Sequence, residues 1–304
     1  MKLSVAVCTW NRAELLFQTL ERMASSLRVP DGVEWELLIV DNNCTDDTDA
    51  VIAAFVDRLP LRRLFQPRQG LANARNLAVR EARGDYIVWT DDDVLVDPSW
   101  LEEYRSAFRR WPEASFFGGP VEPSLPARRP AWLAEAWPLV RTAYAVLDLG
   151  PELVALDHDR LPYGANMAFR LDAQRRFPYD PGLGHDAHGR IGGEETSVMR
   201  ALLAAGAAGR WVPGARVEHV IPEERLSAEY LRAYYTGRGR RLHLEGQVSR
   251  GLPFWVLRML AAETAYHFGR LTSSPDLWIR GLRASSIARG FLGSRDHPRA
   301  APER

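Results

Sequence analysis

The stretch DYIVWTDDD, residues 85–93, indicates the fold class of this chain more directly than any other. The run Tyr86–Trp89 is apolar and has the length of a buried strand, and Asp91, Asp92 and Asp93 come soon after it. Three adjacent carboxylates repel one another unless protons, basic side chains or a metal ion neutralise them. Because ligands bind at the carboxyl ends of strands in open α/β sheets, this stretch predicts a strand that ends at a functional site.

Strand and helix patterns alternate on the N-terminal side of this stretch. Strands are predicted over Leu3–Thr9, Trp35–Val40, Leu61–Phe65 and Asp85–Thr90. The predicted helices carry apolar residues at 15, 16, 20, 23 and 27, then at 51, 52 and 55, and the third spans Leu71–Arg83. Thr45, Asp46 and Asp47 are N-cap candidates for the second helix. Repeated strand–helix–strand units imply a parallel sheet that is covered by helices.

The second half of the chain is less regular. Residues 120–162 are rich in proline and tryptophan and predict a shaped surface segment rather than part of the sheet, with Trp132 and Trp137 on a short helix. The further predicted elements are a strand over Tyr163–Phe169, a glycine-rich loop over Pro181–Gly193, a helix over Glu194–Ala205, strands over Arg210–Pro213 and Ala215–Val220, and a mainly helical region over Ser227–Leu292. We therefore expect an α/β domain over residues 1–225, a helical C-terminal extension over 226–293 and a disordered tail over 294–304.

Composition limits the classes of protein that the chain can belong to. The 304 residues are 46% hydrophobic, which is ordinary for a packed globular protein. The 39 basic and 39 acidic residues give a formal net charge of +0, so overall charge gives no support to nucleic-acid binding.

The cysteines and the N-terminus bear on the compartment. Cys8 and Cys44 fall in or just after predicted core strands, and a reduced compartment fits two such residues best. We interpret them as small buried residues rather than reactive thiols. The N-terminal residues run straight into a strand with no secretory signal pattern, and no apolar run is long enough to span a bilayer. We expect a cytoplasmic protein, with peripheral membrane contact left open.

Short motifs lie at the predicted strand ends and in the loops that follow them. In chain order they are Thr9-Trp10-Asn11-Arg12, Val40-Asp41-Asn42-Asn43 with Thr45-Asp46, Gly70-Leu71-Ala72-Asn73-Ala74-Arg75-Asn76, Thr90-Asp91-Asp92-Asp93, Gly164-Ala165-Asn166 and Gly192-Gly193-Glu194-Glu195. Each is weak alone, but their order and placement resemble those of family 2 glycosyltransferases over about residues 3–239. The resemblance implies the GT-A fold, a Rossmann-like mixed sheet flanked by helices, here with a helical C-terminal extension. It also implies transfer of a sugar from a nucleoside diphosphate donor.

The resemblance implies a divalent cation at the aspartate run. A diphosphate leaving group gains negative charge as the sugar departs, and oxygen ligands suit Mn²⁺ or Mg²⁺. Asp93 matches the metal-ligating member of the D-x-D motif, Asp91 is expected to face the ribose or a metal-bound water, and Asp92 has no settled role. His219 matches a late histidine that completes the metal shell in many GT-A enzymes. A hydrogen-bonded structural histidine is an equally open interpretation.

The resemblance also implies a nucleotide site at the first two strand ends. Asp41 matches the aspartate that accepts a hydrogen bond from a pyrimidine ring nitrogen, and Thr9 and Asn11 are expected to line the same crevice. Arg12 is expected near the base or the phosphates. Arg75 is expected to point towards Asp41 and the nucleotide, where a fixed guanidinium orders both. A solvated charge on the helix surface is the alternative for Arg75.

The general base is implied by the motif before the helix at residue 194. Inverting members carry Glu-Asp there, and the aspartate takes the proton of the acceptor hydroxyl. This chain has Glu194-Glu195, so Glu195 is the candidate base and Glu194 is expected to orient the acceptor or nearby backbone. Acidic residues at a helix start also simply favour the helix dipole, which is the alternative.

The acceptor side rests on weaker signals. The wall of the acceptor site is expected in the segment from Trp132 to residue 163, and Trp132, Trp137 and Asn166 are its candidate contacts. The acceptor is expected to be a carbohydrate, lipid-linked or other hydroxyl. The run His185–His188 resembles a metal cluster but implies no third ligand, so we do not expect a second metal there.

Two segments of the C-terminal region leave alternatives open. Arg238, Arg240 and Arg241 are expected either to fold over a diphosphate or an anionic acceptor, or to form a solvated helix face. Residues 254–268 mix aromatic and aliphatic side chains with arginine, and they are expected to pack on the core or a second subunit, or to lie on a membrane surface.

Four functions are compared on this basis. The first is a metal-dependent glycosyltransferase that uses a nucleoside diphosphate sugar, with UDP as the expected nucleotide, and inverts the anomeric centre. The second is a non-catalytic nucleotide-sugar or glycan-binding module of the same fold, supported by Glu195 in place of aspartate. A nucleotidyltransferase is disfavoured because residues 10–14 contain no glycine, and a dehydrogenase because no G-x-G-x-x-G follows the first strand.

Overall fold

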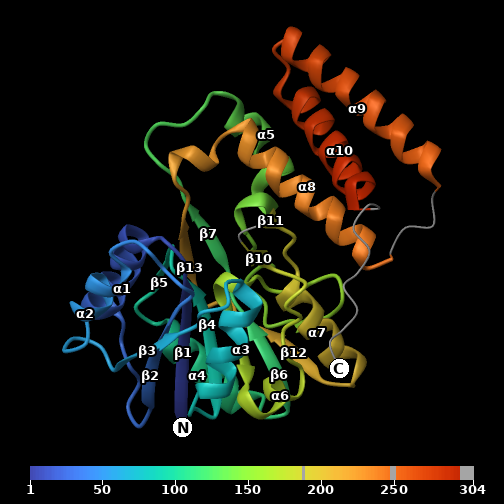
Figure 1. Cartoon of the computed structure of the whole chain (residues 1–304). Coiled ribbons are helices and arrows are strands. Elements are labelled where there is room, and N and C mark those ends of the chain that lie inside the picture. Colours follow the sequence, from blue (N-terminus) through green and yellow to red (C-terminus); the bar gives the residue numbers. More distant parts are fainter. Residues whose placement is uncertain (187–188, 247–250, 295–304) are drawn as a thin grey trace. The chain divides into compact units, whose positions relative to one another are not determined.

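The computed structural model of the chain describes residues 1–186, 189–246 and 251–294. Its backbone forms two compact units (Figure 1). Unit 1 contains described residues 1–124, 145–186 and 194–220, and unit 2 contains 125–144, 189–193, 221–246 and 251–294. The boundary expected at residues 225 and 226 stays a prediction. Residues 295–304 of the expected disordered tail lie outside the described residues.

Unit 1 is built on a mixed sheet of eight strands. In spatial order these are β3 (Leu61–Phe65), β2 (Glu34–Asp41), β1 (Lys2–Thr9), β4 (Tyr86–Asp91), β9 (Met167–Arg170), β6 (Ala114–Gly118), β12 (Ala208–Trp211) and β8 (Ala155–Leu156). The first four strands are parallel, whereas β9 is antiparallel to both β4 and β6. The expected GT-A architecture of a mixed sheet flanked by helices is confirmed.

Helices cover both faces of this sheet because side chains alternate along each strand (Figure 1). Val5 and Val7 of β1 pack in the core under α1 (Ala13–Ser26), α2 (Thr48–Ala53) and α4 (Trp100–Arg110). Ala6 faces the other core, under α3 (Leu71–Glu81), α6 (Leu171–Arg176) and α7 (Glu194–Ala204). The strand ends are therefore held between two packed layers, and only the loops beyond them are free to form a site.

A second sheet in unit 1 continues from the aspartate run. Its strands are β5 (Val94–Val96), β13 (Val217–Val220) and β7 (Val121–Ser124), in that order. β13 runs antiparallel to β5, and the register places His219 opposite Val94. Because Val94 directly follows the aspartates, this pairing carries His219 to them from far along the chain. Unit 1 also contains the 3₁₀ turn Gly164–Asn166 and the two-residue β10 (His185–Asp186).

Unit 2 is helical and draws on separate parts of the chain. It contains α5 (Trp132–Val140), the 3₁₀ turns Arg141–Tyr144 and Glu223–Arg225, β11 (Gly189–Arg190), α8 (Ala228–Leu244), α9 (Leu252–Leu271) and α10 (Pro275–Gly293). Three tyrosines of α8 donate hydrogen bonds to backbone oxygens of residues 139–143, namely Tyr230, Tyr234 and Tyr235. Among the described residues no helix is both long and apolar enough to cross a bilayer.

The structure confirms the N-terminal elements closely and corrects several later ones. The segment 120–162 does contribute to sheets, through β7 and β8, contrary to the expected surface segment. The strand expected over residues 163–169 begins only at Met167, because residues 164–166 form a 3₁₀ turn. No side chain caps α2 at Asp47; instead Asp46 accepts hydrogen bonds from the amide and hydroxyl of Thr48.

Candidate active site at the strand ends

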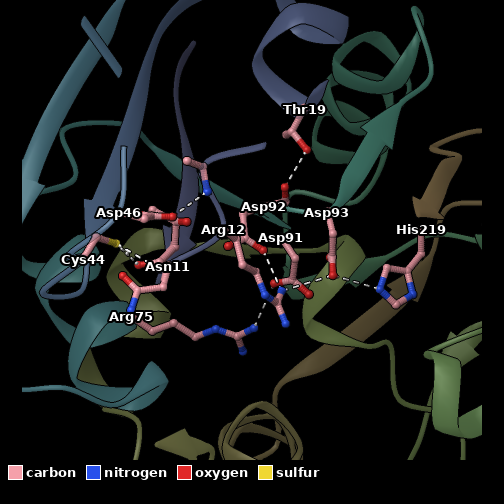
Figure 2. Close-up of polar contacts among 12 residues, drawn as sticks. Asn11, Arg12, Thr19, Cys44, Asp46, Arg75, Asp91, Asp92, Asp93 and His219 are labelled. Atoms are coloured by element: carbon pink, nitrogen blue, oxygen red, sulfur yellow. Dashed lines mark hydrogen bonds and ion pairs between the residues drawn. The ribbon is translucent and has the colours of Figure 1, made fainter. Parts of the chain in front are cut away.

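Three neighbouring parallel strands end at one edge of the sheet, and each delivers a polar side chain there. Thr9 ends β1 and is aligned with Asp41, which ends β2, and Asp91 ends β4 opposite Cys8. Figure 2 shows the charged residues that follow these ends. The strand register therefore places Thr9, Asp41 and Asp91 at one edge of the sheet.

Hydrogen bonds tie the loop after β1 to the loop after β2 (Figure 2). Asn11 has a positive φ of 51°, which turns its amide towards the Cys44 Sγ atom, 3.3 Å away, and its side-chain oxygen accepts from the Thr45 amide at 2.7 Å. Asp46 accepts from the Ala13 amide at the start of α1, at 2.9 Å. Through these contacts, Asn11 and Asp46 hold the loop after β1 against the loop after β2.

Cys8 lies in β1 and Cys44 in the loop after β2, and neither forms a disulfide bond. Burial is the main cause that raises the pKa of the Cys8 thiol to about 12 and that of Cys44 to about 11. A thiol with a raised pKa stays protonated at neutral pH and is a poor nucleophile. The interpretation of these residues as structural rather than reactive is supported.

The buried carboxylate of Asp41 forms an ion pair with the exposed Arg63, a pairing that the sequence did not suggest. Its Oδ2 atom lies 2.5 Å from Nη2 of Arg63 on β3, and its Oδ1 atom accepts from the Cys44 amide at 2.8 Å. Burial opposes ionisation, but the hydrogen bonds from Arg63 and Cys44 outweigh it and lower the pKa of Asp41. Arg75 was expected to point towards Asp41, and this is corrected: Arg63 pairs with Asp41, whereas Arg75 pairs with Asp91 and Glu194. Contact of Arg75 with a nucleotide stays a prediction. Two adjacent arginines on a short strand next to β2 were the available signal.

The three aspartates have different environments. Asp92 is buried and accepts from Arg12 Nη1 at 2.8 Å, and Thr19 of α1 donates to its backbone oxygen at 3.0 Å. Asp93 Oδ2 lies 3.1 Å from the same Arg12 nitrogen and 3.4 Å from Nε2 of His219 (Figure 2). Burial, partly offset by the charge of Arg12, raises the pKa of Asp92 to about 6. Arg12 thus offsets part of the negative charge of the aspartate run, and its expected place near the base or the phosphates stays a prediction.

Asp93 and His219 are the residues that fit a divalent cation. A carboxylate oxygen and an imidazole nitrogen converge there, a donor pair that first-row divalent ions accept. Within residues 1–186, 189–246 and 251–294, no three His, Cys, Asp or Glu side chains converge as a complete metal site. Asp93 and His219 are therefore the candidate protein ligands for a divalent cation.

Arg75 lies on the other side of Asp91, in a closed cage. Its Nη2 atom is 3.7 Å from Asp91 Oδ1, and its Nη1 atom is 3.2 Å from Oε1 of Glu194. The rings of Trp89 and Tyr179 flank the guanidinium, with centroids at 5.6 and 5.5 Å. The alternative interpretation of Arg75 as a solvated helix charge is wrong, because the side chain is only 3% exposed.

Glu194 and Glu195 open α7 next to this cage. Glu194 is buried, and Glu195 is partly buried. Burial, reinforced by the charge of Glu194 and opposed by Arg75, raises the pKa of Glu195 to about 7. A carboxylate with a pKa near 7 is suited to accept a proton at neutral pH.

The predicted acceptor residues belong to different units, Asn166 to unit 1 and the two tryptophans to unit 2. Asn166 is fully buried, and its side chain donates to Pro120 O and Ala215 O while accepting from the Trp100 indole and the Tyr104 hydroxyl. These four bonds use the hydrogen-bonding capacity of the amide, so Asn166 braces the fold rather than contacting an acceptor. The expectation for this residue is corrected.

Trp132 and Trp137 lie in unit 2. Trp132 packs edge-on against Trp278 and Trp137 stacks on Tyr144, both within that unit. Their contact with an acceptor stays a prediction. In the run His185–His188, residues 187 and 188 lie outside the described residues.

Comparison with known proteins agrees with this architecture. The family described as Glycosyl transferase family 2 matches residues 4–154. The succinoglycan biosynthesis protein ExoM of Rhizobium meliloti (strain 1021) is 26% identical over 237 residues, 76% of this chain and 71% of that protein. Validoxylamine A glucosyltransferase of Streptomyces hygroscopicus subsp. limoneus is 33% identical over 107 residues, 34% of this chain and only 23% of that longer protein.

Two solved structures share the fold. S. aureus TarS 1-349, solved with UDP-GlcNAc, superposes with a TM-score of 0.57 at 14% identity and covers 97% of this chain and 92% of its own. The mannosyltransferase PcManGT of Pyrobaculum calidifontis, solved with GDP-Man and Mn²⁺, has a TM-score of 0.56 at 16% identity and covers 99% and 76%. With its strand-end motifs in place and these relatives, the chain belongs to glycosyl transferase family 2 and is a glycosyltransferase.

Proposed function

We propose that this glycosyltransferase is metal-dependent and moves a sugar from a nucleoside diphosphate, UDP in the first instance, to an acceptor hydroxyl with inversion. One observation supports it most. The pair Asp41–Arg63, the aspartates with His219, and Glu195 all belong to unit 1, and the first two groups lie at the ends of β2 and β4, the strands on either side of β1. They supply the separate groups that a nucleotide, a diphosphate and an acceptor hydroxyl require.

The nucleotide proposal is supported by hydrogen-bonding chemistry. Asp41 offers acceptor oxygens and Arg63 offers N–H donors beside them. Uracil presents a ring N–H next to a carbonyl oxygen, which is the complementary pattern, and guanine presents the same pattern. Two proteins of this fold were solved with UDP-GlcNAc and with GDP-Man, which supports a keto base as the class of nucleotide.

The metal proposal rests on Asp93 and His219. These two side chains would hold Mn²⁺ or Mg²⁺, and the cation would supply positive charge to the departing diphosphate. The Mn²⁺ in the mannosyltransferase structure of the same fold supports this. Arg12 contributes a second positive charge at the same place through its contacts with Asp92 and Asp93.

The transfer step is assigned to Glu195. Its carboxylate takes the proton of the acceptor hydroxyl while that oxygen attacks the anomeric carbon on the face opposite the leaving diphosphate, which inverts the centre. The longer side chain of glutamate retains the carboxylate chemistry of the usual aspartate. Glu194 holds Arg75 and does not face the acceptor in this scheme.

The acceptor is proposed to be a carbohydrate hydroxyl, free or lipid-linked. The similarity to a succinoglycan biosynthesis protein over 76% of the chain supports a saccharide acceptor. The unpaired Cys8 and Cys44 support a reducing compartment, for which we propose the cytoplasm. Leu257, Phe268 and Leu271 of α9 are exposed, so peripheral membrane contact or pairing with a second copy stays a proposal.

A thermal-shift panel followed by a sugar-transfer assay tests the proposal. UDP- and GDP-sugars are expected to raise the melting temperature more with Mn²⁺ than without it, because a ligand that binds only the folded state stabilises it. Glu195→Gln is expected to lower transfer by about 10²–10⁴-fold while keeping donor binding. Asp93→Ala is expected to remove the metal-dependent part of the shift.

The matched control is Glu218→Gln, an exposed glutamate on β13 of the same unit, which should leave transfer unchanged. Donor binding that ignores metal and leads to no sugar transfer would instead identify a nucleotide-sugar-binding module. Full transfer by Glu195→Gln would reject the assignment of the base.

A further inference from the structure

The proposed base, Glu195, belongs to a group of charged and aromatic side chains that is largely buried. We call it the Arg75 cage, and its members are Arg75, Trp89, Tyr179, Glu194 and Glu195. It brings together α3, β4, α7 and the segment after α6. Nothing in the proposed transfer step requires Arg75 to touch a substrate, so its burial calls for another explanation.

The cage confines the guanidinium to one position. Gly164 lies against it so closely that a Cβ atom there would stand 2.1 Å from Arg75 Nη2. Gly184 approaches Glu194 less closely, since a Cβ there would be 3.3 Å from Glu194 Oε2. Both members of the pair are about 3% exposed, so neither can turn into solvent.

The polar atoms of the cage are incompletely hydrogen-bonded. Arg75 Nη1, Glu194 Oε2 and Glu195 Oε2 are buried and have no hydrogen-bond partner among the described residues, although the Arg75–Glu194 ion pair is close at 3.2 Å. Buried ion pairs with unused hydrogen-bonding capacity are weak contributors to stability. Such an arrangement is better explained by what it does to a neighbouring group.

We propose that Arg75 and Glu194, an ion pair at the start of α7, act as a positioning pair for the next residue, Glu195, with the guanidinium neutralising Glu194 so that Glu195 is the carboxylate left to exchange a proton. This inference rests on the proposed function, in which Glu195 is the base. Arg75 also lies 3.7 Å from Asp91, so the pair links the aspartate run to the start of α7. Arg75 and Glu194 are positioning residues and not catalytic ones.

The charges that face Glu195 have opposite effects. Glu194 is an anion and favours the protonated form of Glu195, whereas Arg75 favours the ionised form. Tyr179 is the remaining titratable neighbour, and burial raises the pKa of its hydroxyl, so it stays neutral. In unit 2, the Arg241 side chain lies against Gly193, the residue before α7. Removing one member of the pair must therefore move the titration of Glu195 in a direction that depends on which member is removed.

The experiment is a carboxylate titration by NMR of protein labelled with ¹³C at the glutamate side chain. The Glu195 resonance is identified by its loss in Glu195→Gln. In Glu194→Gln the titration should move to lower pH by about one unit, since an anion is lost and Arg75 turns to the remaining carboxylate. In Arg75→Met the last deprotonation of the two glutamates should move to higher pH by a similar amount, because they then share a proton.

The double variant Arg75→Met/Glu194→Gln separates this inference from a merely structural role. It removes both charges of the Arg75–Glu194 pair together, and its Glu195 titration should return to within about half a unit of the wild-type value. Shifts of the same sign in the two single variants, or no shift in Glu194→Gln, would overturn the proposal. Glu194→Gln keeps the shape of the side chain, so the test holds even if Arg75→Met does not fold.

This titration needs no substrate, so its outcome is independent of the proposed reaction. If the protein transfers sugar, the acid limb of kcat/KM against pH should shift with the NMR titration in each variant. If Glu194→Gln and Arg75→Met shift the titration in opposite directions but the protein transfers no sugar, the positioning role of the Arg75 cage would stand and the proposed function would be rejected. If the protein transfers sugar but the acid limb of kcat/KM against pH does not move in the variants, the positioning role of the Arg75 cage would be rejected and the proposed function would stand.

Discussion

At the scale of residues, the aspartate run separates into three kinds of carboxylate. Asp92 is enclosed by Arg12 and by the backbone contact from Thr19, Asp93 faces His219, and about a third of the Asp91 side chain stays exposed beside Arg75. Their different partners explain how three adjacent negative charges are tolerated at one strand end. The same reasoning applies to Glu194 and Glu195, adjacent in sequence but unequal in burial.

The ionised form of Glu195 is predicted to lower the free energy of unfolding at pH values above its pKa in the folded protein. Its pKa is raised from 4.5 to about 7, so between these values the folded protein binds more protons than the unfolded chain, and stability falls as pH rises. Glu195→Gln is therefore expected to stabilise the protein at pH 8 by about 1–3 kcal/mol, although it lowers activity. Urea denaturation measures the difference.

The pH dependence distinguishes this effect from a general one. The stability gained by Glu195→Gln should be smaller at pH 5 than at pH 8, because at pH 5 the wild-type carboxyl is protonated in the folded state. Glu218→Gln, at an exposed site, should show no such dependence. A gain of equal size at both pH values would mean that Glu195 is not the cause.

At the scale of elements, the site depends on which strand lies beside which. β3 pairs with β2 in parallel so that Phe65 is aligned with Asp41, and Arg63 lies two residues earlier on the same face of the strand. The exposed end of the Arg63 side chain can therefore reach Asp41 Oδ2 and Asp49 Oδ1 together. Likewise, the pairing of β13 with β5 delivers His219 to Asp93.

Arg63 is predicted to select the base of the donor. The wild-type protein should bind UDP or GDP more tightly than CDP or ADP, because cytosine and adenine present an acceptor where Asp41 presents one. Arg63→Met should weaken binding of the preferred nucleotide by about 10–100-fold, the loss of one charge-assisted hydrogen bond. Calorimetry with the four nucleoside diphosphates measures this selectivity.

The control for this variant is Arg58→Met, which also breaks an arginine–carboxylate pair, with Glu21, but on an exposed surface. It should leave all four affinities unchanged. Equal weakening of UDP and CDP by Arg63→Met would show that the arginine acts on the phosphates or the fold and not on the base.

At the scale of the whole molecule, unit 2 is not simply the end of the chain. Residues 125–144 leave unit 1 and return to it, and their backbone accepts the tyrosine hydrogen bonds of α8. α10 crosses both α8 and α9 where glycines allow the backbones to approach. The helical extension expected from the sequence therefore has a second part, α5, inserted in the middle of the transferase region.

Gly290→Ala is predicted to destabilise unit 2. A Cβ on Gly290 would stand 2.0 Å from the backbone oxygen of Thr236 on α8, and a Cβ on Gly239 would stand 2.1 Å from that of Ile287. Backbone atoms cannot rotate away, so the helices must separate, at a cost of about 1–3 kcal/mol. Thermal unfolding should show a lower midpoint.

Gly293→Ala provides the comparison for this variant, since nothing lies within 4 Å of its added carbon and it ends the same helix. It should be neutral or slightly stabilising, because alanine favours a helix over glycine. Equal melting temperatures for Gly290→Ala and Gly293→Ala would show that the α8–α10 crossing tolerates a wider spacing.

The sequence by itself determined the alternating half of the fold and the strand ends that carry the site. Over residues 3–91, the period-two spacing of apolar residues in strands and their helical spacing in helices predict which face is buried. The carboxyl ends of β1, β2 and β4 could therefore be predicted to lie at the same edge of the sheet. The motifs in that order also identified the family.

Only the tertiary structure decided which side chains meet. Arg63 and not Arg75 pairs with Asp41. The side-chain amide of Asn166 is fully hydrogen-bonded by four partners inside the protein. His219 lies next to Asp93 because β13 pairs with β5. These outcomes depend on the register and on packing between segments far apart in the chain, which local spacing does not specify. Burial has the same origin: Glu195 acquires a pKa near 7 because the folded chain excludes water from it and encloses it with Glu194 and Arg75.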